Sequence, residues 1–174
     1  KSEKGLEVMH KLLAEADVFI TNMRAKSLAK MGLDWESLHA RYPRLVMGHG
    51  LGYGKKGPEK DNAGFDVTCY MGRGGVFGTT VNKGDAPMIP TNGYGDFQAS
   101  MFLASGILAA LIGREKTGAG DYVTCALEHA AIYALSTGMV SAQYGNQYPK
   151  SRREVNNPLN NVFHSKDDKW VVLC

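Results

Sequence analysis

The chain has few cysteines, and they form no disulfide or metal-binding pattern. Cys69, Cys125 and Cys174 are odd in number, lie far apart and include no C-x-x-C pair. A disulfide scaffold or a zinc site is therefore not expected, and this usage is typical of the reducing cytoplasm. No ligand spacing relates the five histidines, which stand at positions 10, 39, 49, 129 and 164. We therefore expect no metal ion.

Neither sign of charge dominates. Lys and Arg number 20 against 17 Asp and Glu, and the net charge of +3 is too small to indicate a nucleic acid or a membrane surface as partner. The longest uncharged apolar run covers 97–113, and as a helix it would span about 25 Å, short of a bilayer core of about 30 Å. We predict a buried core helix there, and no segment has the pattern of a signal peptide.

Common nucleotide-binding and hydrolase motifs are also lacking. After Gly72 and Gly74, Phe77 occupies the third glycine position of G-x-G-x-x-G, and after Gly93 and Gly95 that position holds a glutamine. No G-K-[ST] phosphate loop or G-x-S-x-G nucleophile elbow is present. The basic run 150–153 is interpreted as a solvated linker. The sequence thus gives no indication of a bound nucleotide or of serine-hydrolase chemistry.

What the sequence does contain is an alternation of helical and strand patterns. With 174 residues, 44% of them hydrophobic, the chain is long enough for one well-packed domain. Asp34 is the expected N-cap of a short helix that Pro43 ends. The patterns predict helices over 2–15, 24–31, 35–41, 65–73, 97–116 and 128–142, and strands over 18–20, 45–47, 122–125 and 170–174. Strand, helices and strand within about 30 residues form a crossover unit, which predicts an α/β fold with a parallel sheet.

The two ends of the sequence suggest that it is an internal part of a longer protein. No initiator Met opens the sequence, and the apolar strand 170–174 has no partner after it. We expect residues 1–144 to be part of a large α/β domain. The polar stretch 145–161 is then a linker, and 162–174 begins a smaller second domain.

Two polar residues stand where a ligand could bind. Asn22 follows the first strand at the carboxyl end of the predicted parallel sheet, where ligands of such sheets bind, and it is equally an N-cap candidate for the next helix. Asp96 follows Gly93 and Gly95 at the start of the long apolar helix. It suits a helix cap, and it also suits a carboxylate nucleophile kept ionised by the helix dipole and reached past the flanking glycine.

The chain resembles the class III acyl-CoA transferases, the CaiB/BaiF type that includes formyl-CoA and carnitine CoA-transferases. The resemblance lies in the order and spacing of several motifs rather than in one of them. They are Ala16-Asp17-Val18-Phe19-Ile20-Thr21-Asn22-Met23-Arg24, Lys30-Met31-Gly32-Leu33, Pro43-Arg44-Leu45-Val46, Gly50-Leu51-Gly52-Tyr53-Gly54, Gly57-Pro58, Gly64-Phe65-Asp66, Gly95-Asp96, Gly106-Ile107-Leu108-Ala109-Ala110-Leu111 and Arg114-Glu115-Lys116-Thr117-Gly118.

The resemblance implies a large CoA-binding domain with a Rossmann-like α/β core and a small domain. It also implies two subunits interlocked as linked rings in a homodimer. The family's first strands and helices would precede residue 1. Most of the small domain, with the glycine-rich loop of the formyl-CoA branch, would follow residue 174.

The resemblance also assigns roles. Asp96 matches the aspartate that forms covalent intermediates, and the CoA-lining positions match Asn22, Met23, Arg24, Lys30, Met31, Gly52 and Tyr53. Lys30 stands where the family often has Arg, so it offers a cation without a bidentate fork. Leu51 stands where the formyl-CoA branch has Lys, which argues against a formate-sized or oxalate-sized substrate.

The implied reaction exchanges CoA between an acyl-CoA and a free carboxylate through aspartyl anhydride and aspartyl-CoA thioester intermediates. It conserves the thioester, so it needs no metal, nucleotide or other cofactor. The stretches 60–66 and 141–145 resemble the anaerobic subgroup that acts on 2-hydroxy acids such as phenyllactate or 2-hydroxyisocaproate.

Two alternatives remain at this point. An α-methylacyl-CoA racemase needs a second acid/base group, which that branch carries as the His of a G-H-D tripeptide. Here Phe65 occupies its place, and Phe cannot transfer a proton. A non-catalytic acyl-CoA-binding subunit would bind CoA and be indifferent to loss of the Asp96 carboxylate.

Overall fold

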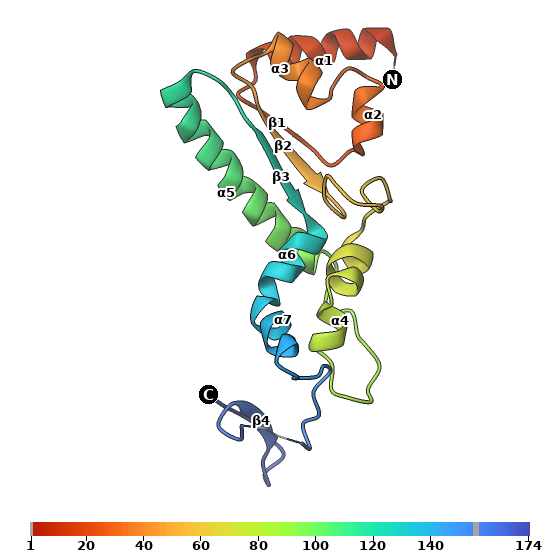
Figure 1. Ribbon diagram of the computed structural model, residues 1–174, viewed down its shortest axis with the longest axis vertical. Helices are drawn as coiled ribbons and strands as arrows, with labels where there is room; N and C mark the ends of the chain where they lie inside the picture. The colour runs from red at the N-terminus through yellow and green to blue at the C-terminus, as the bar shows by residue number, and fades with distance from the viewer. Residues whose placement is uncertain (1, 155–156) are drawn as a thin grey trace.

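The computed structural model describes residues 2–154 and 157–174. In these residues the helices alternate with a small parallel sheet, and a separate hairpin follows (Figure 1). The elements are α1 (Glu3–Glu15), β1 (Val18–Thr21), α2 (Ala25–Ala29), α3 (Trp35–Arg41), β2 (Val46–Leu51), the π-helix η1 (Asp66–Arg73), α4 (Val76–Thr79), α5 (Tyr94–Thr117), β3 (Tyr122–Ala126), α6 (Leu127–Ala134), α7 (Ser136–Gln143), β4 (Asn161–His164) and β5 (Trp170–Leu173).

The main sheet has the order β1-β2-β3, and both pairings are parallel. His49 on the central strand pairs with Thr21 on one side and with Thr124 on the other. The carboxyl ends of all three strands therefore lie at one edge of the sheet. The predicted α/β fold with a parallel sheet is confirmed.

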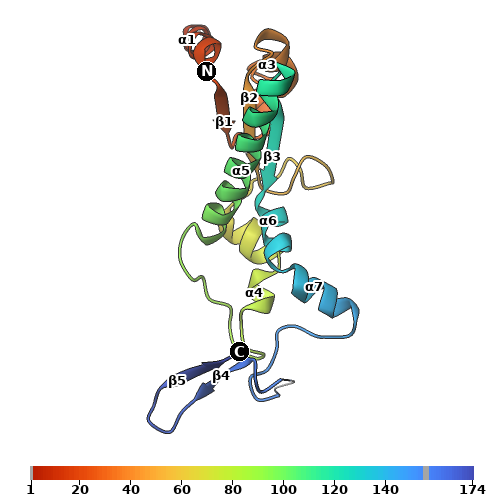
Figure 2. The same ribbon diagram turned by 90° about the vertical axis from the view of Figure 1, so that its left-hand side faces the viewer.

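Helices cover both faces of this sheet. On one face, α1 to α3 bury leucines such as Leu13, Leu28 and Leu38 against Met47 of β2. On the other face, α5 packs Leu103 and Ile107 against the strands. Figure 2, turned by 90° from Figure 1, also shows α5 running along the strands. The sheet is thus wound on both sides, and its carboxyl edge is left between the two layers.

The prediction of a buried core helix is wrong for α5 within the described residues. Only one stripe is buried, made of Gly95, Ala99, Leu103 and Ile107. The outer side is apolar but open, and Phe97 is 73% exposed. The sequence is apolar all round, so periodicity could not tell which side a neighbour covers. By length and composition α5 could also cross a membrane, a test that core helices of soluble proteins pass as well.

Several boundaries differ from the predictions. β2 continues to Leu51, past the end of the strand predicted over 45–47, because its later residues pair with β3. α5 begins at Tyr94, before the start of the helix predicted over 97–116, and the short helix α4 was not predicted. The single helix predicted over 128–142 is two helices, which meet at Leu135.

The C-terminal strand has a partner that the sequence pattern did not indicate. β5 pairs antiparallel with β4, in the register Val162 with Val172. β4 precedes β5 in the chain, and its four residues, with Asn161 and His164 at the ends, are too short a run to be recognised as a strand from the sequence. The linker expected over 145–161 includes residues 155 and 156, which lie outside the described residues.

Candidate active site

A cavity of about 410 Å3 opens at the carboxyl edge of the parallel sheet. Ligands of open parallel sheets bind at this edge, because the strand ends and the following helices leave a crevice there. The polar side chains of its lining are those of Asn22, Asp66, Asp96, Ser100 and Cys125. Its apolar lining consists of Leu51, Phe65, Ala99, Leu103 and Leu127.

Asp96 lies in the first turn of α5 and is exposed at this cavity. It is not the N-cap of the helix. That position is held by Gly93, which adopts the left-handed conformation with φ of 75° and has no side chain to cap with. The cap interpretation of Asp96 is therefore wrong, and its carboxylate is free to face a ligand.

The capping carboxylate of α5 comes from elsewhere in the chain. The buried side chain of Asp66, from η1, accepts a hydrogen bond from the N–H of Gly95 at 3.0 Å. A side chain at position 95 would overlap this carboxylate and the ring of Tyr70, so only glycine fits there. Sequence reasoning considered Asp66 only as part of a tripeptide. Asp66 lies far from α5 along the chain, so no local sequence pattern indicates that its side chain caps this helix.

The two carboxylates influence each other. Partial burial of its carboxyl group raises the pKa of Asp96, although the residue as a whole is exposed, and the negative charge of Asp66 raises it further. This direction is opposite to the effect of a helix N-terminus, on which the sequence-based expectation of a firmly ionised Asp96 rested. The structure thus places Asp96 where desolvation and a like charge make its carboxylate more basic than usual.

The turn after β1 reaches the same cavity through Asn22. Asn22 is not the N-cap of α2 either, since that position is held by Arg24. The N–H group and the carbonyl oxygen of Met23 both have side-chain partners. Its N–H donates to Thr21 Oγ1 at 3.1 Å, and its carbonyl oxygen lies 2.7 Å from His49 Nε2. The turn is therefore fixed from behind while Asn22 faces the cavity.

The other sequence-predicted CoA positions do not line this cavity. Arg24 and Lys30 are exposed at the two ends of α2, and Met31 packs at the edge of the core beneath it. Gly52 approaches Gly64 so closely that a Cβ on it would lie 2.9 Å from the Gly64 Cα atom. Tyr53 is half-buried beside the Cys69 thiol, which raises the pKa of the phenol.

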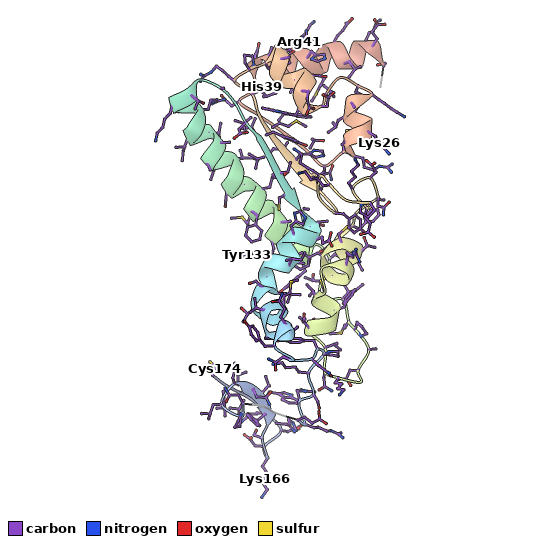
Figure 3. All side chains as sticks on the ribbon, in the orientation of Figure 1. Lys26, His39, Arg41, Tyr133, Lys166 and Cys174 are labelled. Atoms are coloured by element: carbon purple, nitrogen blue, oxygen red, sulfur yellow. The ribbon has the colours of Figure 1, made fainter. Side chains whose placement is uncertain are left out.

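Figure 3 shows that the loop after β2 lies next to α2. Lys26 extends from this helix toward the loop, where its Nζ atom lies 2.8 Å from Asp61 Oδ2. The loop that carries Gly52 and Tyr53 is thereby tied to the helix that carries Arg24. Within 2–154 and 157–174, no group of three His, Cys, Asp or Glu residues could hold a metal ion.

The fold and the cavity define an α/β protein with a ligand site at the carboxyl edge of its sheet and an accessible carboxylate at the start of a long helix. The family model for CoA-transferase family III matches residues 1–174. The chain therefore belongs to CoA-transferase family III, which confirms the resemblance.

Relatives of known activity are similar over the whole chain. It is 46% identical over 174 residues to (R)-2-hydroxy-4-methylpentanoate CoA-transferase of Clostridioides difficile. It is 49% identical over 177 residues to cinnamoyl-CoA:phenyllactate CoA-transferase of Clostridium sporogenes. Both comparisons cover 100% of this chain but only 44% and 43% of the respective relatives. The chain thus spans less than half the length of these proteins.

A solved structure supports the same assignment. A CAIB/BAIF family protein from Brucella suis superposes with a TM-score of 0.83 at 29% sequence identity. The superposition covers 98% of this chain and 45% of that one. The fold of the described residues is therefore that of part of a CaiB/BaiF protein.

Proposed function

We propose that the full-length protein transfers coenzyme A between an acyl-CoA donor and a free carboxylic acid, with Asp96 as the covalent nucleophile. The observation that carries this proposal is the placement of Asp96. It is exposed at the cavity at the sheet's carboxyl edge, which Asn22 also lines, and Asp66 takes the capping role in its place.

The proposed reaction balances without any further reactant. A carboxylate oxygen of Asp96 attacks the acyl-CoA thioester carbon, the C–S bond breaks, and an aspartyl-acyl anhydride and CoA thiolate form. The thiolate attacks the aspartyl carbonyl, which gives aspartyl-CoA thioester and the free donor acid. The acceptor carboxylate then repeats the two steps in reverse order. The raised basicity of Asp96 favours the first attack, because a more basic carboxylate is a better nucleophile once ionised.

A 2-hydroxy acid with an apolar side chain is the proposed substrate class. The cavity wall beside Asp96 is formed largely by Leu51, Leu103, Leu127 and Phe65. Such a wall suits a branched or aromatic acyl group, and the described residues that line the cavity include no Lys or Arg to pair with a compact dianion such as oxalate. The names of the two relatives, a 2-hydroxy-4-methylpentanoate and a phenyllactate CoA-transferase, support the same class.

The CoA moiety is proposed to run from the cavity across the turn after β1. Asn22 and Met23 would line its entrance, and the cations of Arg24 and Lys30 at the two ends of α2 would meet the phosphates. The remaining predicted contacts, Met31, Gly52 and Tyr53, would form the wall on either side. This path places the thioester at the cavity and the charged nucleotide end toward solvent.

The exposed apolar face of α5 supports the proposed homodimer, in which two subunits, each with a large and a small domain, are interlocked. Phe97, Met101 and Ile112 are exposed along this helix. Tyr133 projects from α6 (Figure 3), and its ring meets that of Phe102 with centroids 5.2 Å apart. An exposed apolar face of this extent marks an interaction surface. We propose that other parts of the full-length dimer cover it, with 1–144 in the large domain, 145–161 as linker and 162–174 in the small domain.

The decisive experiment uses the full-length enzyme without ATP. It is incubated with an unlabelled acyl-CoA and a panel of isotopically labelled acids, and the thioester pool is read by mass spectrometry. We expect label from branched and aromatic 2-hydroxy acids to appear, and little from oxalate or formate. Absence of label across the whole panel would remove the transferase proposal.

A chemical trap tests the nucleophile in the same preparation. Enzyme incubated with acyl-CoA and then treated with hydroxylamine should lose activity and carry a modification on Asp96. If CoA binds but neither exchange nor trapping is seen, the non-catalytic binding subunit becomes the better description. In a parallel incubation in D2O, entry of deuterium at the α-carbon of the acyl-CoA without CoA exchange would favour the racemase, although no histidine is found among the described residues that line the cavity.

A further inference from the structure

A fully buried histidine lies behind the turn that follows β1. His49, on the central strand, is 1% exposed. Both of its ring nitrogens have partners: Nδ1 lies 2.7 Å from the hydroxyl of Tyr122, and Nε2 lies 2.7 Å from the carbonyl oxygen of Met23. The proposed reaction uses neither His49 nor Tyr122.

The partners fix where the proton of the imidazole resides. A carbonyl oxygen can only accept, so Nε2 must carry the hydrogen and donate it to Met23. Burial lowers the pKa of His49 by more than the hydrogen bond to Met23 raises it, and the charge of Lys55 lowers it further. The ring is therefore neutral, and Nδ1 accepts from the Tyr122 hydroxyl. The order of donation therefore runs from Tyr122 to His49 to the Met23 backbone.

We propose that Tyr122 and His49 are positioning residues that hold the Asn22–Arg24 turn in its CoA-binding arrangement. The inference rests on the proposed function, because it assumes that this turn contacts CoA. Tyr122 donates to Nδ1 of His49 and so holds the orientation of the imidazole ring, and His49 holds the carbonyl group of Met23. Thr21 holds the N–H of the same residue, so both backbone groups of Met23 are tied to buried side chains.

The geometry separates this role from the chemistry at Asp96. His49 and Tyr122 stand on the face of the sheet that α1 to α3 cover, since Tyr122 packs against that core and stacks on Trp35 at 5.6 Å between ring centroids. α5, which carries Asp96, covers the opposite face. Loosening the turn should therefore weaken CoA binding and leave the acyl-transfer steps at saturating CoA unchanged.

The test is a pair of variants in the full-length enzyme with a matched control. Tyr122→Phe removes only the hydroxyl and keeps the stacked ring, while His49→Ala removes the donor to Met23. Tyr42→Phe is the control, because Tyr42 forms a second His–Tyr pair with His10, at 3.2 Å, away from the cavity. If His49→Ala does not fold, Tyr122→Phe alone decides the outcome.

The first readout is hydrogen exchange of a peptide covering 22–31, measured without CoA. Loss of one net hydrogen bond should speed exchange there by about fivefold in Tyr122→Phe and His49→Ala, with no change in Tyr42→Phe. Unchanged exchange in a folded Tyr122→Phe variant would overturn the proposal, whatever the protein does with CoA.

The second readout separates CoA binding from turnover. The KM for acyl-CoA and the CoA dissociation constant should rise by about fivefold in Tyr122→Phe, while kcat at saturating acyl-CoA stays within about twofold of the wild type. Faster exchange with an unchanged dissociation constant would overturn the link to CoA. A wild type that neither binds CoA nor exchanges it would refute the proposed function instead, and the hydrogen-exchange result would still decide whether His49 holds the turn.

Discussion

Two segments meet at the cavity, and they are held in different ways. The turn after β1 is fixed by the neutral side chains of Thr21 and His49. The start of α5 is fixed by the carboxylate of Asp66. A neutral anchor fixes position alone, whereas a charged anchor also sets the basicity of what lies next to it, here Asp96. The binding segment and the reactive segment therefore differ in electrostatics as well as in place.

The largest effect that would sharpen this contrast is loss of the reactive carboxylate itself. In Asp96→Asn the amide cannot form an anhydride, so exchange should fall by at least about 1,000-fold. Because Asp96 caps nothing, the fold should be retained, with an unchanged circular dichroism spectrum and an unchanged CoA dissociation constant. Asp85→Asn, in the exposed loop before α5, is the matched control. Turnover near the wild-type value in a folded Asp96→Asn enzyme would end the assignment of the nucleophile.

Substitutions of Asp66 separate its two effects on α5. Asp66→Ala removes the capping hydrogen bond to Gly95 and should lower the free energy of unfolding by about 1 kcal/mol. Asp66→Asn keeps an oxygen acceptor but removes the charge, so stability should be closer to the wild type. Denaturant unfolding of both variants checks the order, and equal stability of the Ala and wild-type enzymes would contradict the capping role.

The same Asp66→Asn variant should shift the pH dependence of the reaction. Asp96 must be ionised to attack, so activity is lost as the pH falls through its pKa. Asp66 raises that pKa, and removing the charge should therefore move the acidic limb of kcat/KM to lower pH. A limb that stays in place, or moves to higher pH, would show that the two carboxylates are not coupled as described.

A smaller effect is expected on the binding side. Lys30→Ala should weaken CoA binding by about fivefold at low salt, because a charge-assisted contact to phosphate is lost. The difference should shrink as salt screens the charge. Lys11→Ala, on the exposed surface of α1, supplies the comparison. Identical dissociation constants for Lys30→Ala and the wild type at low salt would remove Lys30 from the CoA path.

Much of the fold could be predicted from local patterns. The strand-helix-strand order up to β2 was sufficient to predict a parallel α/β fold. Asp34 was also predicted correctly as a cap, since its carboxylate accepts from the N–H of Ser37 at 3.1 Å. These features depend on residues within a few positions of one another, which a sequence pattern can show.

Failures of prediction cluster where distant segments meet. The outer face of α5 looked like core because apolar residues surround that helix, yet only the side against β2 and β3 is covered within the described residues. β4 was not predicted, because only its pairing with β5 identifies it as a strand. Asn22 and Asp96 each looked like caps, because Asn and Asp at a helix start are capping residues in most local settings.

The sequence by itself determined the family, the order of the main elements and the identity of Asn22 and Asp96 as candidate site residues, because these follow from residue type and spacing. Only the tertiary structure decided that neither residue is a cap and that both face one cavity. It also showed that Asp66 anchors the start of α5 and that His49 anchors the turn after β1. The physical reason is separation along the chain. His49 lies 26 residues from Met23, and Asp66 lies 29 residues from Gly95, each in another element. A hydrogen bond between two elements leaves no periodic pattern in the sequence.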